Sequence, residues 1–138
     1  MGYSVPVTVR GYELDIQGHL NQAVYLQYGE HARWETLMAA GVSQDKLLAE
    51  AIGPVVLETT IKYLKELRGG DRVTVSCEFE WGEGKTFRIR QEIRKADGTL
   101  CAEIVAVGGV LDHSLRRLVA DPVGRFRALA EDPSIMGL

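Results

Sequence analysis

The sequence is poor in cysteine and has no long apolar run. Its 138 residues include only two cysteines, Cys77 and Cys101, whose separation matches no metal or redox motif. We expect both thiols to be reduced and to fill the core as small apolar groups. No stretch reaches the roughly 20 apolar residues of a membrane span, and residues 1–9 lack the basic and apolar regions of a secretory signal. These absences predict a cytoplasmic protein without a membrane partner.

The sequence has no excess of positive charge, with 16 Lys and Arg against 19 Asp and Glu, and several motifs of known chemistry are missing. The formal net charge of -3 argues against nonspecific nucleic-acid binding, which needs a basic surface. The sequence has no Gly-x-Ser-x-Gly elbow of a serine hydrolase and no glycine-rich loop that leads into Lys-Ser or Lys-Thr. Its histidines and cysteines are not spaced as metal ligands. If the protein is an enzyme, a mechanism without metal or cofactor is expected.

What the sequence does contain is a regular alternation of apolar and polar residues, which is typical of β-strands. The alternation predicts strands near residues 3–10, 55–63, 73–81 and 87–94, each with one buried face and one face that is wet or interfacial. Residues 100–111 are apolar on both faces, so we place this strand inside the sheet. Tight turns that contain glycine join most of the later strands.

A long helix is predicted over residues 22–40, with Asn21 as its N-cap and Gly41 as its end. Its polar side chains form one narrow stripe, made of Gln27, Glu30, His31 and Glu35. The remaining surface is mainly apolar or small, and a helix with so wide an apolar surface is predicted to be mostly buried. Two short helices are predicted near residues 44–51 and 123–130.

The order of these elements predicts a single α+β domain over residues 1–138. One antiparallel sheet of five strands would wrap around one long helix. Pro6 favours an edge position for the first strand, because proline has no N–H to donate. One helix covers only part of a long sheet, so pairing with a second copy of the chain is the expected way to complete burial.

The loop before the long helix, residues 12–21, is the densest polar stretch that directly precedes a helix predicted to be buried. It brings Asp15, His19 and Asn21 close to a helix N-terminus, where free backbone N–H groups and the helix dipole gather. Such a place stabilises negative charge on a carbonyl oxygen, and a nearby carboxylate can attack that carbonyl or activate water. The alternative is that Asp15 and Asn21 only order the loop and cap the helix.

Residues 12–33, YELDIQGHLNQAVYLQYGEHAR, resemble the opening motif of the 4-hydroxybenzoyl-CoA thioesterase-like branch of the hotdog superfamily. That motif has an Asp, two variable residues, Gly-His-Val/Leu-Asn, then Tyr-Leu and a later Glu-x-Ala-Arg. The matching positions are Asp15, Gly18, His19, Leu20, Asn21, Tyr25, Leu26, Glu30, Ala32 and Arg33. Residues 61–65, followed by Gly70 and Asp71, also resemble the second strand of that family and its exit turn.

The resemblance implies a hotdog fold and the hydrolysis of an acyl thioester, presented by CoA or by an acyl carrier protein, to a free acid and a thiol. It implies that Asp15 is the catalytic nucleophile or general base, and that backbone N–H groups near Gln22 and Ala23 polarise the thioester carbonyl. It also implies an active site between two subunits, an acyl tunnel beside the helix, and a homodimer that assembles further into a tetramer. The sequence departs from the family at Glu13, where many relatives carry Asp, and at Gln22, where Asn or an aromatic is common.

Several further residues are assigned to the substrate site. The residues expected to contact the substrate or to shape its site are His19, Asn21, Gln22, Ala23, Tyr25 and Glu58. His19 and Asn21 are expected chiefly to hold the loop and to cap the helix. Glu58 falls on the strand that should approach the helix start, in the same chain or in a partner.

Two other functions stay open at this point. A dehydratase or hydratase on the same fold would use Glu30 or His31, and an acyl-CoA-binding module would carry out no catalysis. Arginine suits phosphate, so several arginines could contact CoA. A solvated, ion-paired surface is the favoured interpretation for these residues, which are Arg68, Arg72, Arg88, Arg90 and Arg94.

Overall fold

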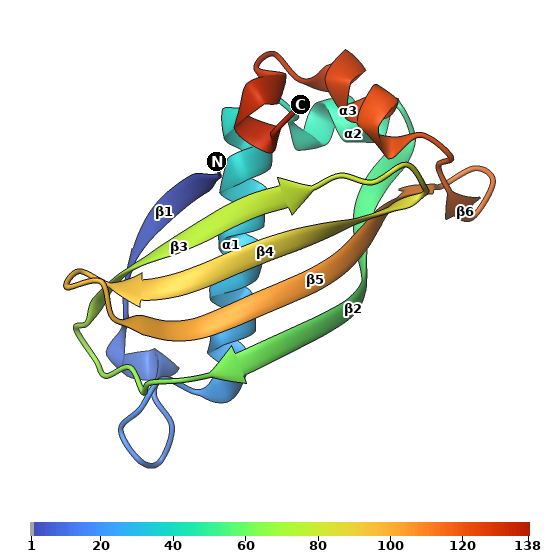
Figure 1. Cartoon of the computed structure of the whole chain (residues 1–138). Coiled ribbons are helices and arrows are strands. Elements are labelled where there is room, and N and C mark those ends of the chain that lie inside the picture. The colour runs from blue at the N-terminus through green and yellow to red at the C-terminus, as the bar shows by residue number, and fades with distance from the viewer. Residues whose placement is uncertain (1) are drawn as a thin grey trace.

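The computed structural model describes residues 2–138 and contains one antiparallel sheet and one long helix (Figure 1). The strands are β1 (Tyr3–Thr8), β2 (Ile52–Tyr63), β3 (Arg72–Glu80), β4 (Thr86–Lys95), β5 (Leu100–Asp112) and β6 (Arg117–Leu118). The helices are α1 (Gln22–Ala39), α2 (Gln44–Ala49) and α3 (Pro122–Leu129), with the 3-10 helices η1 (Gly11–Glu13) and η2 (Pro133–Met136). The predicted α+β architecture is confirmed, and the two residues of β6 extend the sheet beside β5.

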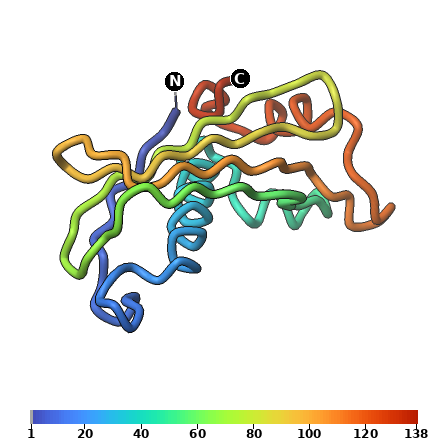
Figure 2. The backbone as a smooth tube through the Cα atoms, turned by 60° about the horizontal axis from the view of Figure 1, so that its bottom comes forward, coloured from blue at the N-terminus to red at the C-terminus, as the bar shows by residue number. Residues whose placement is uncertain are grey.

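The strands lie in the order β1-β3-β4-β5-β2, and each neighbouring pair is antiparallel. As predicted, β5 is internal, and β1 with its Pro6 forms an edge. The second edge is β2. Figure 2 shows the sheet curving over α1, which lies along one of its faces. The buried apolar side chains therefore lie between this face and the helix.

Helix α1 begins and ends where the sequence predicted, within one residue. Asn21 caps its start, because its Oδ1 accepts the N–H of Ala23 at 2.9 Å. Gly41 follows its end with a φ of +84°, a conformation that glycine adopts without strain. The N-terminus of α1 is therefore fixed by a side chain of the same loop that carries Asp15.

The prediction that α1 is mostly buried is wrong for the single chain. One face packs against the sheet through Tyr25, Tyr28, Gly29, Ala32 and Thr36. On the other side, large apolar side chains are exposed: Leu26, Trp34 and Met38. The physical reason is that one sheet can cover only one face of a cylinder, whereas the apolar surface of α1 is wider than that face.

The prediction that one face of β2 is buried is also wrong for the single chain, because no complete face of this strand is buried there. The pairing with β5 shifts between Val56 and Glu58, which places Leu57 in a β-bulge. Leu57 and Tyr63 are 53% and 47% exposed. Within residues 2–138 no strand pairs with the outer edge of β2, so its apolar side chains lack a covering layer.

The C-terminal segment closes the end of α1 that lies opposite the loop of residues 11–21 (Figures 1 and 2). The backbone N–H groups of Glu131 and Asp132 donate to the Ala40 carbonyl at 2.8 and 3.0 Å. The Trp81 indole N–H donates to the Met136 carbonyl at 2.7 Å. No helix within residues 2–138 combines the length and the hydropathy that crossing a membrane requires.

Candidate active site

The loop between β1 and α1 is held in place by a charged and phenolic network. Glu13 accepts a hydrogen bond from the Tyr28 hydroxyl of α1 at 2.6 Å and pairs with Arg10 at 3.2 Å. Burial acts to raise the pKa of Glu13, but the hydrogen bonds from Tyr28 and Arg10 and the charge of Arg10 outweigh it, so this pKa lies below its usual value. Burial and the neighbouring Glu13 raise the pKa of Tyr28, so its phenol stays protonated and donates. The Asn21 N–H also reaches the Glu13 carbonyl at 3.0 Å.

Asp15 orders this loop with one carboxylate oxygen. Its Oδ1 accepts the backbone N–H groups of Gln17 at 2.9 Å and His19 at 3.2 Å, as in an Asx turn. The Asp15 N–H in turn donates to the His19 carbonyl at 2.8 Å. Within the part of the chain that the structure describes, Oδ2 receives no hydrogen bond. Asp15 therefore does order the loop, and it still has one oxygen available for chemistry.

The backbone N–H of Gln22 stands out among those at the start of α1, because it has no acceptor within residues 2–138. The neighbouring N–H groups all donate within the chain: Leu20 to Leu67, Asn21 to Glu13, Ala23 to the Asn21 side chain, and Val24 to the Asn21 carbonyl. The N–H of Ala23 is thus already used by the helix cap. Because the positive end of the helix dipole lies here, the Gln22 N–H can donate to a bound carbonyl oxygen.

Asp15 and Gln22 line the same open depression, whose volume is about 260 Å³. His19 and Tyr25 also line it, so the structure brings together four of the residues that the sequence assigned to the site. The Tyr63 hydroxyl donates to the Gln22 carbonyl at 3.0 Å, which ties the end of β2 to the start of α1. The fold therefore joins two segments that are about 40 residues apart in the chain, as the separation of this hydrogen-bonded pair shows.

Residues 63–66 form the second wall of the depression, and no role was predicted for them from the sequence. Their only sequence signal was the resemblance at residues 61–65. The rings of Tyr63 and Tyr25 meet edge to face with their centroids 5.0 Å apart. Tyr25 is buried, and burial raises the pKa of its phenol, whose hydroxyl lies 3.5 Å from the Lys65 carbonyl. This aromatic pair gives the depression a rigid base.

A second, apolar cavity of about 220 Å³ lies between α1 and the inner face of the sheet. Six of its lining residues are Trp34 and Leu37 of α1, Leu47 of α2, Val55 of β2, Phe87 of β4 and Phe126 of α3. Apolar and aromatic walls of this kind suit a hydrocarbon or aromatic group. The cavity lies beside α1, and its use as the acyl tunnel that the resemblance implies stays a prediction.

Arg33 enters the wall of this cavity as a half-buried cation. Its Nη1 donates to Oε1 of Gln91 at 3.0 Å, and Nε2 of Gln91 donates to the Gly29 carbonyl at 2.8 Å. Burial lowers the pKa of Arg33. Helix α1 packs directly against the sheet at Gly29, because this residue has no side chain. A Cβ there would lie 3.0 Å from Cδ1 of Ile104. These contacts fix the distance between α1 and β4.

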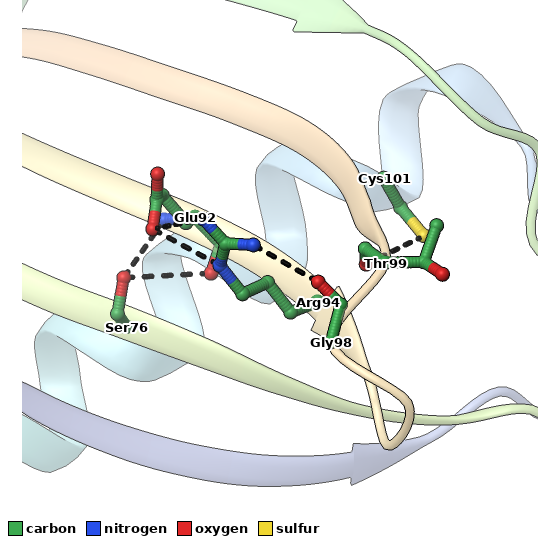
Figure 3. Close-up of polar contacts among 6 residues, drawn as sticks. All are labelled: Ser76, Glu92, Arg94, Gly98, Thr99 and Cys101. Atoms are coloured by element: carbon green, nitrogen blue, oxygen red, sulfur yellow. Dashed lines mark hydrogen bonds and ion pairs between the residues drawn. The ribbon is translucent and has the colours of Figure 1, made fainter.

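Two of the arginines considered for CoA phosphates are engaged in ion pairs on the outer face of the sheet. Arg90 pairs with Glu80 at 2.5 Å. Arg94 contacts Glu92 at 3.2 Å and the Gly98 carbonyl at 2.9 Å (Figure 3). Arg68 also contacts Glu66, at 3.6 Å, so the interpretation of an ion-paired surface is confirmed for these three arginines.

Five residues that the sequence suggested for catalysis or substrate binding are absent from the lining of the depression: Asn21 and Ala23, which form the helix cap, and Glu30, His31 and Glu58. Glu30 borders the apolar cavity instead, and His31 is exposed on α1. Glu58 is exposed on β2, five residues before Tyr63, which corresponds to roughly 16 Å along a strand. Within one chain, the side chains of Glu30, His31 and Glu58 therefore do not join Asp15.

The described residues contain no group of three or more His, Cys, Asp or Glu side chains that could hold a metal ion. Cys77 and Cys101 are both free and fully buried, which confirms their predicted place in the core. Burial raises the pKa of the Cys77 thiol to about 11, so this thiol stays protonated at neutral pH. Neither cysteine lines the depression around Asp15.

Comparison with known protein families identifies the superfamily of this chain. Residues 9–129 match the model of the thioesterase-like superfamily. The chain belongs to this superfamily. The matched range includes the loop of Asp15, all of α1 and the strands that form both cavities, so the superfamily assignment covers the whole candidate site.

The chain is also similar to two named thioesterases and to a solved structure. The chain is 29% identical over 115 residues to the long-chain acyl-CoA thioesterase FadM of Escherichia coli, covering 83% of the chain and 86% of FadM. It is 38% identical over 75 residues to the chloroplast acyl-acyl carrier protein thioesterase ATL3 of Arabidopsis thaliana, covering 54% of the chain but only 40% of ATL3. The crystal structure of YbaW from Escherichia coli superposes with a TM-score of 0.80 at 28% identity, over 91% of this chain and 93% of YbaW. The predicted hotdog fold is confirmed.

Proposed function

We propose that this protein hydrolyses acyl thioesters and that Asp15 is its catalytic carboxylate. The observation that supports the proposal is the shared depression, in which a carboxylate with one free oxygen lies beside a helix N-terminal N–H without an acceptor. A thioester carbonyl is already electrophilic, so a carboxylate and an aligned N–H donor are the groups that its hydrolysis needs.

In the proposed mechanism the thioester carbonyl oxygen accepts a hydrogen bond from the Gln22 N–H, where the helix dipole favours negative charge. Oδ2 of Asp15 then attacks the carbonyl carbon and expels the thiolate. Water hydrolyses the resulting anhydride, which restores the Asp15 carboxylate and supplies the proton that converts the thiolate into the thiol. Alternatively, Oδ2 removes a proton from the water that attacks. Both routes release a free acid and a thiol. The two hydrogen bonds to Oδ1 hold the carboxylate in a defined orientation during either route.

The proposed substrate carries its acyl group on CoA or on an acyl carrier protein. FadM is named an acyl-CoA thioesterase, and ATL3 is named an acyl-acyl carrier protein thioesterase. The depression is open to solvent, so the thiol arm can enter while the rest of the carrier stays outside. Lys65 lies on its rim and can meet an acidic group of either carrier.

We also propose that two copies of the chain complete the site. The uncovered side of α1 and the edge strand β2 expose large apolar side chains, including Leu26, Trp34 and Leu57. An unpaired strand edge with such side chains is suited to pairing with a second copy. In this arrangement Glu58 can approach the helix start of the partner. A further tetramer remains a prediction, as does the cytoplasmic location, which the two free cysteines favour.

The test is to replace Asp15 with Asn and to measure thiol release from a panel of acyl-CoA and acyl-carrier-protein thioesters. An Asn side chain keeps an Oδ1 acceptor for the N–H groups of Gln17 and His19, so the loop keeps its shape while the carboxylate is lost. We expect kcat/KM to fall by about 10² to 10⁴. Asp97→Asn is the matched control, because Asp97 accepts the Thr99 N–H at 2.9 Å in the turn between β4 and β5, in a similar turn that does not line the depression.

Three outcomes separate the alternatives. Undiminished thiol release by a folded Asp15→Asn protein would overturn the role of Asp15. Tight acyl-CoA binding by calorimetry, without thiol release at high protein concentration, would instead indicate a binding module. Conversion of a 3-hydroxyacyl or enoyl thioester without thiol release would indicate a dehydratase or hydratase that uses Glu30 or His31.

A further inference from the structure

His19 is half-buried in the loop before α1, and within residues 2–138 its imidazole makes no hydrogen bond. Its backbone orders the loop, because its N–H donates to Oδ1 of Asp15 at 3.2 Å and its carbonyl accepts the Asp15 N–H at 2.8 Å. The loop therefore uses the backbone of His19 and leaves both ring nitrogens free. An imidazole can donate and accept a proton near neutral pH, so its place beside a candidate catalytic carboxylate suits acid-base chemistry.

Asp15 and His19 are cross-strand partners in a small hairpin. A β-bridge between Leu14 and Leu20 joins the two arms of this hairpin. The hydrogen bond from the Asp15 N–H to the His19 carbonyl lies one residue closer to the turn, and Gly18, with a φ of +78°, completes the turn in the left-handed conformation of a three-residue loop. Directly opposed side chains project from the same face of such a pair, with their Cβ atoms about 4.5–5.5 Å apart.

The opposite face of this hairpin is apolar and turned to the core. Leu20 and Leu67 are 3% and 0% exposed, and the N–H of Leu20 donates to the Leu67 carbonyl at 2.7 Å. Leu14 packs against the same core. Because successive side chains of a strand point to opposite faces, Asp15 and His19 point away from these leucines. Both residues line the depression, so the carboxylate and the imidazole face the same bound substrate.

The segment after β2 brings further charged groups to the other side of His19. His19 forms a β-bridge with Arg68, so Glu66, two residues earlier, lies on the same face and diagonally across from the imidazole. Glu66 lines the depression and contacts Arg68 at 3.6 Å. A backbone hydrogen bond and nearby positive charges, first among them that of His19, hold the pKa of Glu66 below its usual value. The charged groups around the imidazole are therefore the anions Asp15 and Glu66 and the cations Lys65 and Arg68.

The proposed hydrolysis needs a proton source other than Asp15. Expulsion of the thiolate leaves negative charge on sulfur, and an alkyl thiol has a pKa of about 8.5 or above, as cysteine does. A thiolate of this basicity departs faster when an acid protonates it in the transition state. In the nucleophilic route Asp15 is bonded to the acyl carbon at that moment, so it has no proton to give.

We propose that the His19 imidazole is a second catalytic group, which protonates the departing thiolate; this inference rests on the proposed hydrolysis. In the nucleophilic route Oδ2 of Asp15 bonds to the acyl carbon, the carbon–sulfur bond breaks, and the proton of the imidazolium moves to the sulfur. The neutral imidazole then takes a proton from water, whose oxygen bonds to the acyl carbon and releases the Asp15 carboxylate and the free acid. The imidazolium is thus restored, and one water molecule is consumed.

The experiment compares two thioesters of the same acyl group that differ in their leaving thiol. CoA departs as a basic alkyl thiolate, whereas 4-nitrothiophenol is a much stronger acid and departs without a proton donor. His19→Gln keeps the backbone contacts with Asp15 but cannot donate or accept a proton. Because kcat/KM covers only the steps up to thiol release, it reports the protonation directly. We expect His19→Gln to lower kcat/KM by about 10² to 10⁴ for the acyl-CoA and by less than about threefold for the aryl thioester.

The pH dependence of the wild type tests the same step without a substitution. For the acyl-CoA, kcat/KM should fall at high pH, where the imidazole has lost its proton, and this fall should be absent for the aryl thioester. His113→Gln is the matched control, because His113 is exposed in the turn after β5 and does not line the depression. It should leave kcat/KM unchanged for both thioesters.

An equal loss of kcat/KM for both thioesters in His19→Gln would indicate a structural or binding role and would overturn the proposal. The same fall at high pH for both thioesters in the wild type would overturn it as well. A loss confined to the acyl-CoA in His19→Gln, together with undiminished activity of Asp15→Asn, would support the acid role of His19 and refute the role of Asp15. If the wild type releases thiol from neither thioester, the proposed hydrolysis fails and the role of His19 fails with it.

Discussion

The buried contact between Arg33 and Gln91 leads to a sharp prediction about stability. Gln91 is 1% exposed and makes two hydrogen bonds, one accepted from Arg33 and one donated to the Gly29 carbonyl. The replacement Gln91→Leu removes a bond to a charged donor, worth about 1.5–3 kcal/mol, and a neutral one worth about 0.5–1.5 kcal/mol. Burial of the apolar leucine side chain offsets part of this loss of stability. We expect Gln91→Leu to lower the free energy of unfolding by about 2–3 kcal/mol.

A double-mutant cycle isolates the contact itself. Arg33→Met leaves Oε1 of Gln91 without its donor, and the double replacement removes both partners together. The double variant should therefore be less destabilised than the sum of the single variants, by about 1.5–3 kcal/mol. Urea denaturation at one fixed protein concentration measures all four proteins, since association of copies would make the stability depend on concentration.

The exposed pair of Arg94 and Glu92 on the outer sheet face serves as the comparison (Figure 3). Its side chains are each 43% exposed, so water screens the two charges and the same cycle should yield a coupling of about 0.2–1 kcal/mol. A coupling of Arg33 and Gln91 no larger than that of this exposed pair would refute the reasoning that burial strengthens the contact.

Two further predictions concern assembly and pH. Leu57→Lys places a charge on the exposed bulge of β2 and should reduce the molecular mass measured by light scattering to that of the single chain, whereas Leu115→Lys, at an equally exposed site off the β2 edge, should leave the mass unchanged. The pKa of Glu13 is lowered in the fold, so the stability that this group contributes is present above its unfolded pKa of about 4.3 and is lost as the pH falls through the lower folded value. Thermal unfolding from pH 6 to pH 3 should show the advantage of the wild type over Glu13→Gln shrinking below about pH 4.3, and a constant difference would contradict it.

Much of the fold could be predicted because the sequence carries local signals for it. Alternation located the strands, the continuous apolar run placed β5 inside the sheet, and Asn21 and Gly41 marked the ends of α1. The burial of α1 and β2 could not be predicted in the same way. An apolar side chain that is buried in the core of its own chain cannot be distinguished, from the sequence alone, from one that would be buried only by a second copy.

The candidate site was predictable in part. The loop and its resemblance singled out Asp15, His19, Gln22 and Tyr25, and the structure places these residues around one depression. Residues 63–66 were missed, because their role depends on a contact between segments about 40 residues apart. Which backbone N–H lacks an acceptor also depends on contacts from distant residues, among them the Leu67 carbonyl.

The sequence by itself determined the α+β class, the helix that starts at Gln22 and the carboxylate that precedes it, because capping, alternation and the loop motif act over a few neighbouring residues. Only the tertiary structure decided that the Ala23 N–H is used by the cap while that of Gln22 is not, and that Phe126 of the C-terminal helix lines the apolar cavity beside α1. Both depend on packing between segments distant in the chain, and the geometry of such packing follows from the whole fold and from no single stretch of residues.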